Sequence, residues 1–152
     1  MTLRGYNKLQ DELRHLKGVE RPQIIEAIAI ARALGDLSEN AEYHAAKDRQ
    51  GMVESRISDI EDKLSKATVI DVSKIKSDMV KFGATVVLAN DDDGSLSTFQ
   101  IVGSDEADVS KGLIPITSPI AQGLIGKQKD DWIEIVSPGG AKGYTVVDVA
   151  YR

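Results

Sequence analysis

The stretch YHAAKDRQGMVESRISDIEDKLSKA, residues 43–67, decides the fold of the N-terminal half. Two sets of mostly apolar residues recur in it every seven positions: Tyr43, Gln50, Ile57 and Leu64 form one set, and Ala46, Val53, Ile60 and Ala67 form the other. This spacing is typical of the seam of a coiled coil. The stretch is therefore predicted to be one long helix that packs along a second helix.

A matching seam lies earlier in the chain. It runs through Leu9, Leu13 and Leu16 and is expected to continue after Pro22 through Ala27, Ile30 and Leu34. Antiparallel arms that fold about residue 38 pair Leu13 with Leu64, Leu16 with Ile60, Ile30 with Ala46 and Leu34 with Tyr43. The predicted hairpin is about 40 Å long at 1.5 Å per residue. Gly18 and Pro22 are expected to interrupt or bend its first arm.

The C-terminal half has a different pattern, rich in valine, isoleucine, threonine and glycine. Four stretches with β-branched content and partial alternation predict strands: residues 83–89, 97–103, 132–137 and 143–151. One short helix is predicted from Pro119 to Ile125. We therefore expect an α+β protein, with a helical hairpin over residues 1–75 and an antiparallel β-sheet domain over residues 76–152.

The composition excludes several classes of function. The 152 residues include no cysteine and two histidines, which excludes disulfides, thiolate nucleophiles and multi-histidine metal sites. A net charge of −5 argues against general binding to nucleic acid through phosphates. No run of about 18 apolar residues occurs, so no membrane span is predicted. The lack of cysteine suits a reducing cytoplasm.

The turn between the predicted helices, Gly35–Asn40, permits two interpretations. Gly35 suits the end of the first helix, and the spacing of Asp36 and Glu39 suits a capping box for the second. Alternatively, the two carboxylates lie on one helical face at an exposed tip and share a divalent cation. Two carboxylates are too few for tight Mg²⁺ binding, so the tip would bind metal only when another molecule supplies the remaining ligands.

Four stretches of this sequence resemble the bacterial Gre transcript cleavage factors. They are GDLSENAEYHAAKDRQG at 35–51, MTLRGYNKLQDEL at 1–13, ATVIDVSKI at 67–75 and IVGSDEADVSKGLIPITSPIAQGLIGKQKDDWIEI at 101–135. The resemblance covers essentially the whole chain and preserves the order of the motifs. It implies that the C-terminal domain is similar to FK506-binding-protein folds, although the few aromatic residues argue against a prolyl isomerase pocket.

The resemblance also implies a mechanism. Such a factor enters the secondary channel of bacterial RNA polymerase when the enzyme has slid backward, and Asp36 and Glu39 would help to hold a second Mg²⁺ in the polymerase active centre. The protein would bind no cofactor alone and would be an accessory factor, not an enzyme. Its expected partners are RNA polymerase and the 3′ segment of the nascent RNA, with DNA nearby in the complex. A cytoplasmic monomer is expected.

The resemblance assigns further residues around the tip. Arg32 and Lys47, with Arg49 as a weaker addition, match basic positions that approach the RNA; the alternative is a solvated, locally paired charged face. Asn40 and Tyr43 are expected to support the tip. Asn40 would either bond the backbone at the turn or assist at the polymerase site, and Tyr43 would pack in the seam against Leu34.

A second group is expected to dock on the polymerase: Asp105, Glu106, Asp108, Ser118, Pro119 and Ile120. The alternative for this group is ordinary turn and core packing. Two rival functions also remain, an inhibitor of the polymerase channel built on the same scaffold, and an isomerase or chaperone with a coiled-coil arm.

Overall fold

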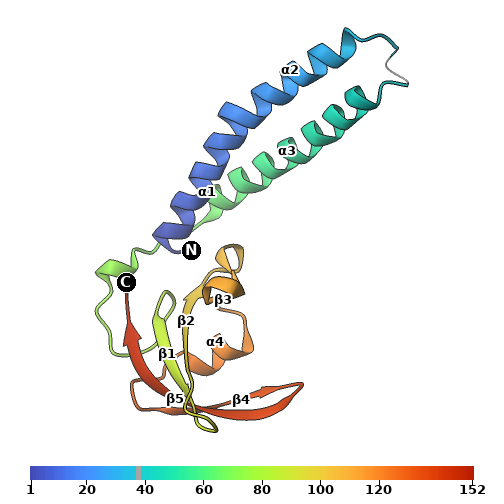
Figure 1. Ribbon diagram of the computed structural model, residues 1–152. Helices are drawn as coiled ribbons and strands as arrows, with labels where there is room; N and C mark the ends of the chain where they lie inside the picture. The colour runs from blue at the N-terminus through green and yellow to red at the C-terminus, as the bar shows by residue number, and fades with distance from the viewer. Residues whose placement is uncertain (37–38) are drawn as a thin grey trace. The chain divides into compact units, whose positions relative to one another are not determined.

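The computed structural model describes residues 1–36 and 39–152. Contacts divide the chain into two compact units, one formed by Tyr6–Ala67 and the other by Met1–Gly5 together with Thr68–Arg152. The first is a helical hairpin and the second is built on a β-sheet (Figure 1). The predicted fold class is confirmed. No helix within the described residues is long and apolar enough to cross a lipid bilayer.

Two antiparallel arms form the hairpin. The first consists of α1 (Leu3–His15), the π-helical turn η1 (Leu16–Glu20) and α2 (Arg21–Arg32), and the second is the single 26-residue helix α3 (Ala41–Lys66). The π turn lies at Gly18, and Pro22 occupies the first turn of α2. The predicted interruption of the first arm is therefore confirmed.

Buried side chains show that the seam shifts beyond this interruption. Leu9 and Leu16 are buried as predicted, and the buried residues of α3 are Val53, Ile57 and Ile60. On α2 the prediction is wrong, because the buried residues are Ile24, Ile28 and Ala31, whereas Ile30 and Leu34 are 57 % and 64 % exposed. A π turn holds one more residue than an α turn, so every later position moves by one.

The second unit contains a five-stranded sheet in the order β3-β2-β1-β5-β4. Its strands are β1 (Thr85–Asn90), β2 (Leu96–Val102), β3 (Leu113–Pro115), β4 (Trp132–Ser137) and β5 (Gly140–Ala150). All neighbouring pairs are antiparallel except β2 with β3, which is parallel. The sheet is therefore mixed and not purely antiparallel, because the short strand β3 escaped sequence prediction.

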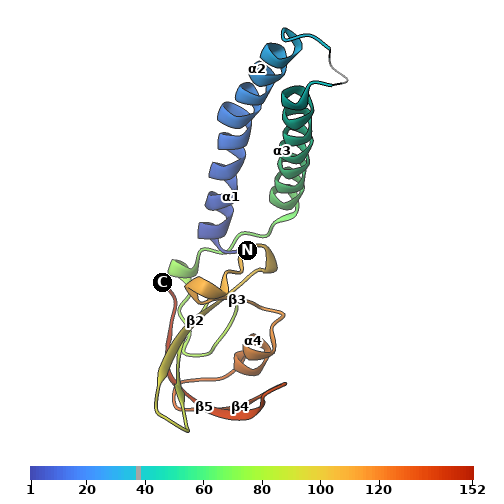
Figure 2. The ribbon, with the colours of Figure 1, turned by 45° about the vertical axis from the view of Figure 1, so that its right-hand side comes forward.

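One face of this sheet carries the core of the unit. Val86 and Leu88 of β1 are buried in alternation with half-buried neighbours, as expected for a strand that covers a core on one side. The helix α4 (Pro119–Leu124) packs on this core through Ala121 and Leu124, and Figure 2 shows it beside the sheet. Three short 3₁₀ turns complete the unit: η2 (Val72–Lys74), η3 (Ser104–Glu106) and η4 (Val109–Lys111).

Candidate functional site

The two candidate carboxylates lie in the turn between α2 and α3. Gly35 has a φ of +121°, a conformation that favours glycine, and turns the chain directly after the first arm. Asp36 and Glu39 are both exposed and lie outside the helices. The remaining tip residues, Leu37 and Ser38, lie outside the described residues. An exposed pair of acidic side chains at the end of a hairpin is accessible to another macromolecule.

The start of α3 differs from the predicted capping box. Asn40 is the N-cap, and its Oδ1 accepts a 3.0 Å hydrogen bond from the Tyr43 amide. Because α3 begins at Ala41, Asp36 and Glu39 both precede it and do not share a helical face. The capping role predicted for these two acids is therefore wrong. Asn40 satisfies the helix end, so the acids are not needed for that task.

Asn40 also ties the two arms together. Its Nδ2 donates a 2.6 Å hydrogen bond to the carbonyl oxygen of Ala31, which belongs to the seam of α2. One amide side chain therefore fixes the first turn of α3 against the last turn of α2. This geometry supports the expected bonding of Asn40 to the backbone at the turn.

Aromatic and cationic side chains flank the first turn of α3. The Arg32 guanidinium carbon lies 5.9 Å from the centre of the Tyr43 ring, within the range of a cation–π interaction. The His44 ring meets Tyr43 edge to face at 5.5 Å. Leu34 is largely exposed and Tyr43 is half-buried, and Arg32 is a neighbour of Tyr43 across the arms.

The other basic candidates occupy different surroundings. Lys47 is exposed one helical turn after Tyr43, and its Nζ donates to Gln50 at 3.2 Å. Arg49 forms an ion pair with Glu20 of the π turn at 3.4 Å. The structure therefore places Arg32 against Tyr43 and Lys47 one turn further along α3, whereas Arg49 contributes to the contact between the arms.

Ion pairs along the hairpin are its main electrostatic feature. Arg56 contacts Glu12 through two hydrogen bonds of 2.8 and 2.9 Å, and Arg21 contacts Glu54 through two of 2.7 and 2.8 Å. The hydrogen bond from Arg56 lowers the pKa of Glu12, and that from Arg21 lowers the pKa of Glu54. Since each pair joins α3 to the first arm, these bonds confirm the antiparallel arrangement.

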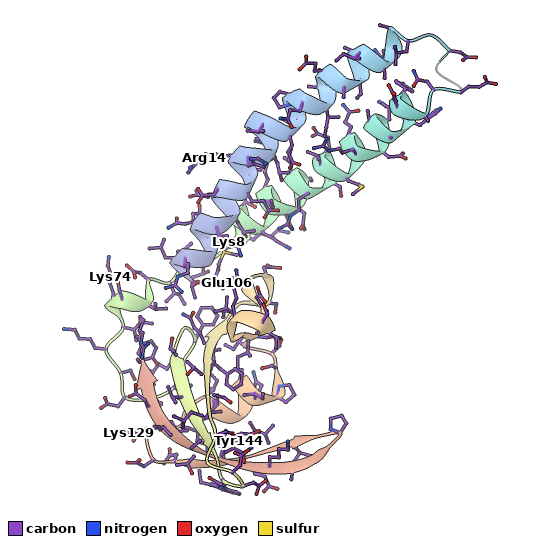
Figure 3. The ribbon with its side chains drawn as sticks, in the orientation of Figure 1. Lys8, Arg14, Lys74, Glu106, Lys129 and Tyr144 are labelled. Carbon is purple, nitrogen blue, oxygen red and sulfur yellow. The ribbon has the colours of Figure 1, made fainter. Side chains whose placement is uncertain are left out.

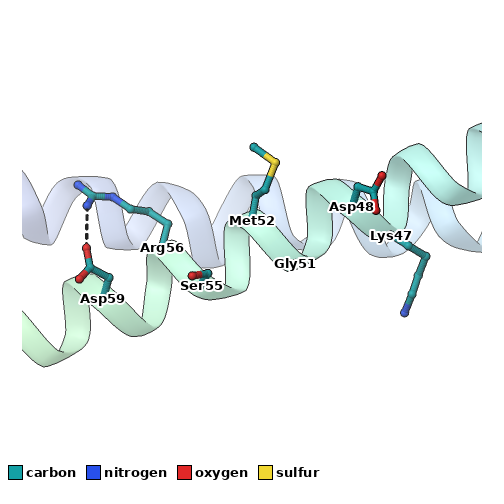
Figure 4. A pocket seen from close by; sticks show the side chains of 7 residues that line it. All are labelled: Lys47, Asp48, Gly51, Met52, Ser55, Arg56 and Asp59. Atoms are coloured by element: carbon teal, nitrogen blue, oxygen red, sulfur yellow. Dashed lines mark hydrogen bonds and ion pairs between the residues drawn. The ribbon is translucent and has the colours of Figure 1, made fainter.

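A shallow hollow lies on the outer surface of α3 (Figure 4). It is lined by Lys47, Asp48, Gly51, Met52, Ser55, Arg56 and Asp59. All seven residues come from one helix, and its Arg56 is already bound to Asp59 and Glu12. Neither a nucleophile with an adjacent base nor an enclosed apolar space is formed there. The hollow therefore lacks the features of an enzyme active site.

In the described part of the chain, no group of three or more histidine, aspartate or glutamate side chains could hold a metal ion. Carboxylates are suitable ligands for Mg²⁺, which prefers six oxygen ligands. The carboxylates of Asp36 and Glu39 have this chemistry, and their sharing of an ion with another molecule stays a prediction.

Glu106, one of the expected docking residues, anchors the N-terminus within the sheet unit. Its carboxylate accepts hydrogen bonds from the Thr2 amide at 3.0 Å, from the Thr2 hydroxyl and from the Gly103 amide at 2.8 Å. Figure 3 labels the Glu106 side chain. Thr2 is buried, so these bonds satisfy groups that water cannot reach. Sequence reasoning missed this role, because the partners are 104 residues apart and no local pattern marks the bond.

The other docking candidates lie in turns and at the start of α4. Asp108 caps η4 by accepting from the Ser110 amide at 3.1 Å, and Ser118 caps α4 by accepting from the Ala121 amide at 3.1 Å. Pro119 is exposed, whereas Ile120 packs partly against the core. Asp105 is exposed on η3. These positions have structural roles, and their part in docking stays a prediction.

Comparison with known proteins identifies the family. The family described as "Transcription elongation factor, N-terminal" matches residues 1–69, and "Transcription elongation factor, GreA/GreB, C-term" matches residues 75–151. A protein of Chelativorans sp. named transcription elongation factor GreA is 60 % identical over 99 % of this chain and 96 % of its own. One of the same name from Rhodopseudomonas palustris is 56 % identical over 100 % and 96 %.

Solved structures give a weaker likeness. A GreA/GreB factor from Nitrosomonas europaea has a TM-score of 0.45 at 28 % identity and covers 62 % of this chain and 79 % of its own. The GreA factor homologue Gfh1 of Thermus thermophilus has a TM-score of 0.42 at 27 % identity over 98 % and 96 %. Both scores lie below 0.5, so the assignment rests on the sequence matches. These matches do not favour the isomerase or inhibitor alternatives, and the chain belongs to the GreA/GreB family of transcription elongation factors.

Proposed function

We propose that this protein stimulates RNA polymerase to cleave its own nascent RNA after the enzyme has slid backward on the template. The observation that carries the proposal is the exposure of Asp36 and Glu39 together at the end of a helical hairpin. In the proposed complex the hairpin enters the secondary channel of the polymerase, and its tip reaches the active centre. The RNA is then shortened at a phosphodiester inside the enzyme, and the new 3′ end is extended.

The length of the hairpin supports this role. Its second arm, α3, has 26 residues and spans about 39 Å at 1.5 Å per residue. The two ion pairs Glu12–Arg56 and Arg21–Glu54 hold the arms together along this length. Such a rod holds its tip at the end of a long pair of helices without needing a large core. The tip can therefore act inside a partner that the rest of the chain does not enter.

The chemistry of the tip limits what this chain does by itself. A second Mg²⁺, when bound in the complex, would activate water or stabilise the leaving oxygen in phosphodiester hydrolysis. Asp36 and Glu39 would supply two of its oxygen ligands, and polymerase residues, RNA and water would supply the others. Both carboxylates are accessible without a change in either helix. The chain is thus an accessory factor that completes a site in a larger enzyme.

Arg32 and Lys47 are proposed to approach the backtracked RNA. Arg32 lies against Tyr43 and Lys47 lies one turn further along α3, and both are exposed. A pair of cations suits a short RNA segment that the polymerase already holds, whereas the overall charge of −5 disfavours RNA binding in isolation. Arg49, paired with Glu20, is less available for this contact.

The sheet unit is proposed to dock on the rim of the channel. Exposed Asp105 and Pro119, with neighbouring Asp108, Ser118 and Ile120, are the candidate contact residues. Glu106 would act indirectly, by holding the N-terminus beside η3. Since bacterial RNA polymerase works in the cytoplasm, the proposed site of action is cytoplasmic, and one copy per polymerase suffices.

An RNA cleavage assay tests this function. Backtracked polymerase complexes with end-labelled RNA are incubated with Mg²⁺, with and without the protein, and the protein is also incubated with free RNA. We expect faster cleavage only when polymerase and protein are both present. Cleavage of free RNA would show that the chain is itself a nuclease. Slower cleavage and slower extension in the complex would instead identify a channel inhibitor.

A further inference from the structure

The π turn Leu16–Glu20 changes which face of α2 packs on α3. An uninterrupted heptad repeat from Leu9 and Leu16 would bring Gln23, Ala27 and Ile30 to the seam. The structure instead buries residues one position later, Ile24, Ile28 and Ala31. The shift of one residue is the amount that a single π turn absorbs.

The helix α2 therefore carries two adjacent apolar stripes. The packed stripe is Ile24, Ile28 and Ala31, and the second stripe is Ala27 and Ile30, followed by Leu34 just beyond the helix. All three residues of the second stripe are exposed. The outer face of a hairpin is normally polar, so an exposed aliphatic stripe next to the packed one is unusual. Each stripe has the spacing needed to pack against α3.

We propose that the π turn is a register switch that exchanges these two stripes. When its i→i+5 hydrogen bonds are replaced by i→i+4 bonds, the helix downstream rotates by about 100°, the angle of one residue. Ala27, Ile30 and Leu34 then face α3, and Ile24, Ile28 and Ala31 turn outward. Gly18 and Val19 in the middle of the π turn are exposed, and a Cβ on Gly18 would contact nothing. The turn is held to α3 by the buried Leu16 and by an ion pair of 3.4 Å between Lys17 and Glu61.

Specific contacts favour the observed register. Glu20 and Arg21, at the end of the turn, pair with Arg49 and Glu54 of α3, and a rotation of α2 would separate both pairs. In the second register the polar Gln23, which precedes the second stripe, would also take the place of Ile24 in the seam. The second register is therefore the minor state, and a partner that binds it more tightly would raise its population.

The switch would reposition the tip. Rotation of α2 carries the Ala31 carbonyl away from Asn40 and breaks the bond that ties the two arms at the turn. Asp36 lies four residues beyond the end of α2 and Glu39 lies before α3, so the two registers would present the Asp36 carboxylate differently relative to Glu39. This consequence rests on the proposed function of the two acids, whereas the switch itself is a property of the hairpin alone.

Disulfide trapping in the free protein tests the switch. Because the sequence contains no cysteine, only the introduced pair can form a disulfide. The pair Ile30→Cys/Ala46→Cys reports the second register, and Ala31→Cys/Ala46→Cys is the matched control for the observed one. We expect the first pair to cross-link about 10 to 1,000 times more slowly than the second, as for a minor conformational state.

Two further changes separate a switch from local fraying. Deletion of Val19 removes the extra residue, so Ile24, Ile28 and Ala31 follow Leu16 in one regular heptad. The deletion should slow the cross-link between positions 30 and 46 by at least about tenfold. Gln23→Leu extends the second stripe by one apolar residue and should accelerate the cross-link between positions 30 and 46. If positions 30 and 46 cross-link at the same rate in the Val19 deletion and in the Gln23→Leu variant, the proposal is overturned. If the deletion variant fails to fold, the response to Gln23→Leu decides alone.

The trapped forms then test the link to function. The oxidised forms of Ala31→Cys/Ala46→Cys and Ile30→Cys/Ala46→Cys are compared in the RNA cleavage assay, each against its reduced form. We expect their activities to differ by at least about tenfold, with reductant removing the difference. Equal activity of the two trapped forms would refute the effect on the tip. Absence of cleavage stimulation by the unmodified protein would instead refute the proposed function and leave the cross-linking result unaffected.

Discussion

Asn40 joins the two arms of the hairpin to each other through Ala31, whose carbonyl oxygen accepts a 2.6 Å hydrogen bond from the Asn40 side chain. The same side chain caps α3 by accepting from the Tyr43 amide. The residue next to the acidic turn is therefore also the residue that fixes how the two helices meet there. Positioning of the tip and stability of the hairpin depend on one amide.

Replacement of Asn40 should weaken the hairpin measurably. Asn40→Ala removes the cap and the bond to Ala31, and we expect a loss of about 1–2 kcal/mol in the free energy of unfolding. Asn40→Asp keeps the capping oxygen and removes the amide donor, so its loss should be smaller. Urea unfolding followed by helical circular dichroism measures both. Asn7→Ala, at an exposed position of α1, is the control, and equal stability of Asn40→Ala and this control would contradict the assigned role.

The Thr2–Glu106 contact predicts a stability effect in the sheet unit. Glu106→Ala leaves the buried Thr2 amide and hydroxyl and the Gly103 amide without their partner. We expect a loss of roughly 1–3 kcal/mol. The fluorescence of Trp132, the single tryptophan, reports unfolding of this unit. Asp105→Ala, on the exposed neighbour, should lose less stability than Glu106→Ala.

The same two variants separate docking from folding. If Asp105 docks on polymerase, Asp105→Ala lowers the affinity by more than its change in stability explains. If Glu106 acts only by anchoring Thr2, its effect on affinity should follow its effect on stability. A Glu106→Ala protein of normal stability would show that the anchoring contact contributes little.

A steric prediction concerns the turn before β3. Gly112 has a φ of +73°, and a Cβ there would lie 2.7 Å from the Thr98 carbonyl oxygen. Gly94 has nearly the same φ, +72°, with open space around it. Both alanine variants carry backbone strain of about 1 kcal/mol or more, but only Gly112→Ala also displaces β2. Trp132 fluorescence should therefore show a larger loss for Gly112→Ala, and equal losses would contradict the close approach.

The cross-arm ion pairs predict a dependence of hairpin stability on pH. The pKa values of Glu12 and Glu54 are lowered below their ordinary value near 4.5 by hydrogen bonds from Arg56 and Arg21. Their contribution is present above that value and is lost as the pH falls through the lowered pKa of each group. Both pairs are partly exposed, so the effect is modest and decreases with added salt.

The double variant Glu12→Gln/Glu54→Gln measures this contribution. Between pH 7 and pH 3 its unfolding free energy should fall less steeply than that of the unmodified protein. Glu42→Gln, in the first turn of α3, is a control for the loss of a carboxylate. If the double variant and the unmodified protein lose stability in parallel, the ion pairs do not couple to folding.

The hairpin could be predicted from the sequence as far as its periodicity remained regular. Leu9, Leu16, Ile57 and Ile60 follow a heptad spacing and are buried as that spacing requires. The shift beyond Leu16 could not be predicted, because a π turn depends on one extra backbone residue and not on residue type. Gly18 and Pro22 indicated an interruption but not its size.

Other errors arose where a contact joins distant segments. The strand β3 has three residues, too few for a pattern, and is defined by its pairing with β2. Asp36 and Glu39 have the spacing of a capping box, but Asn40 satisfies the helix end because its amide also reaches Ala31. The acidic turn itself could be predicted from the sequence, because its residues are close together in the chain and belong to a long motif.

Neutralisation of the two tip carboxylates tests the central claim most directly. Asp36→Asn and Glu39→Gln are added separately to backtracked polymerase complexes, with Glu42→Gln as the matched control, and both the cleavage rate and the polymerase affinity are measured. Each tip variant should lose at least about tenfold of the stimulated cleavage rate, about 1.4 kcal/mol of barrier, while its affinity is retained. Full stimulation by a protein that carries both substitutions would contradict the account.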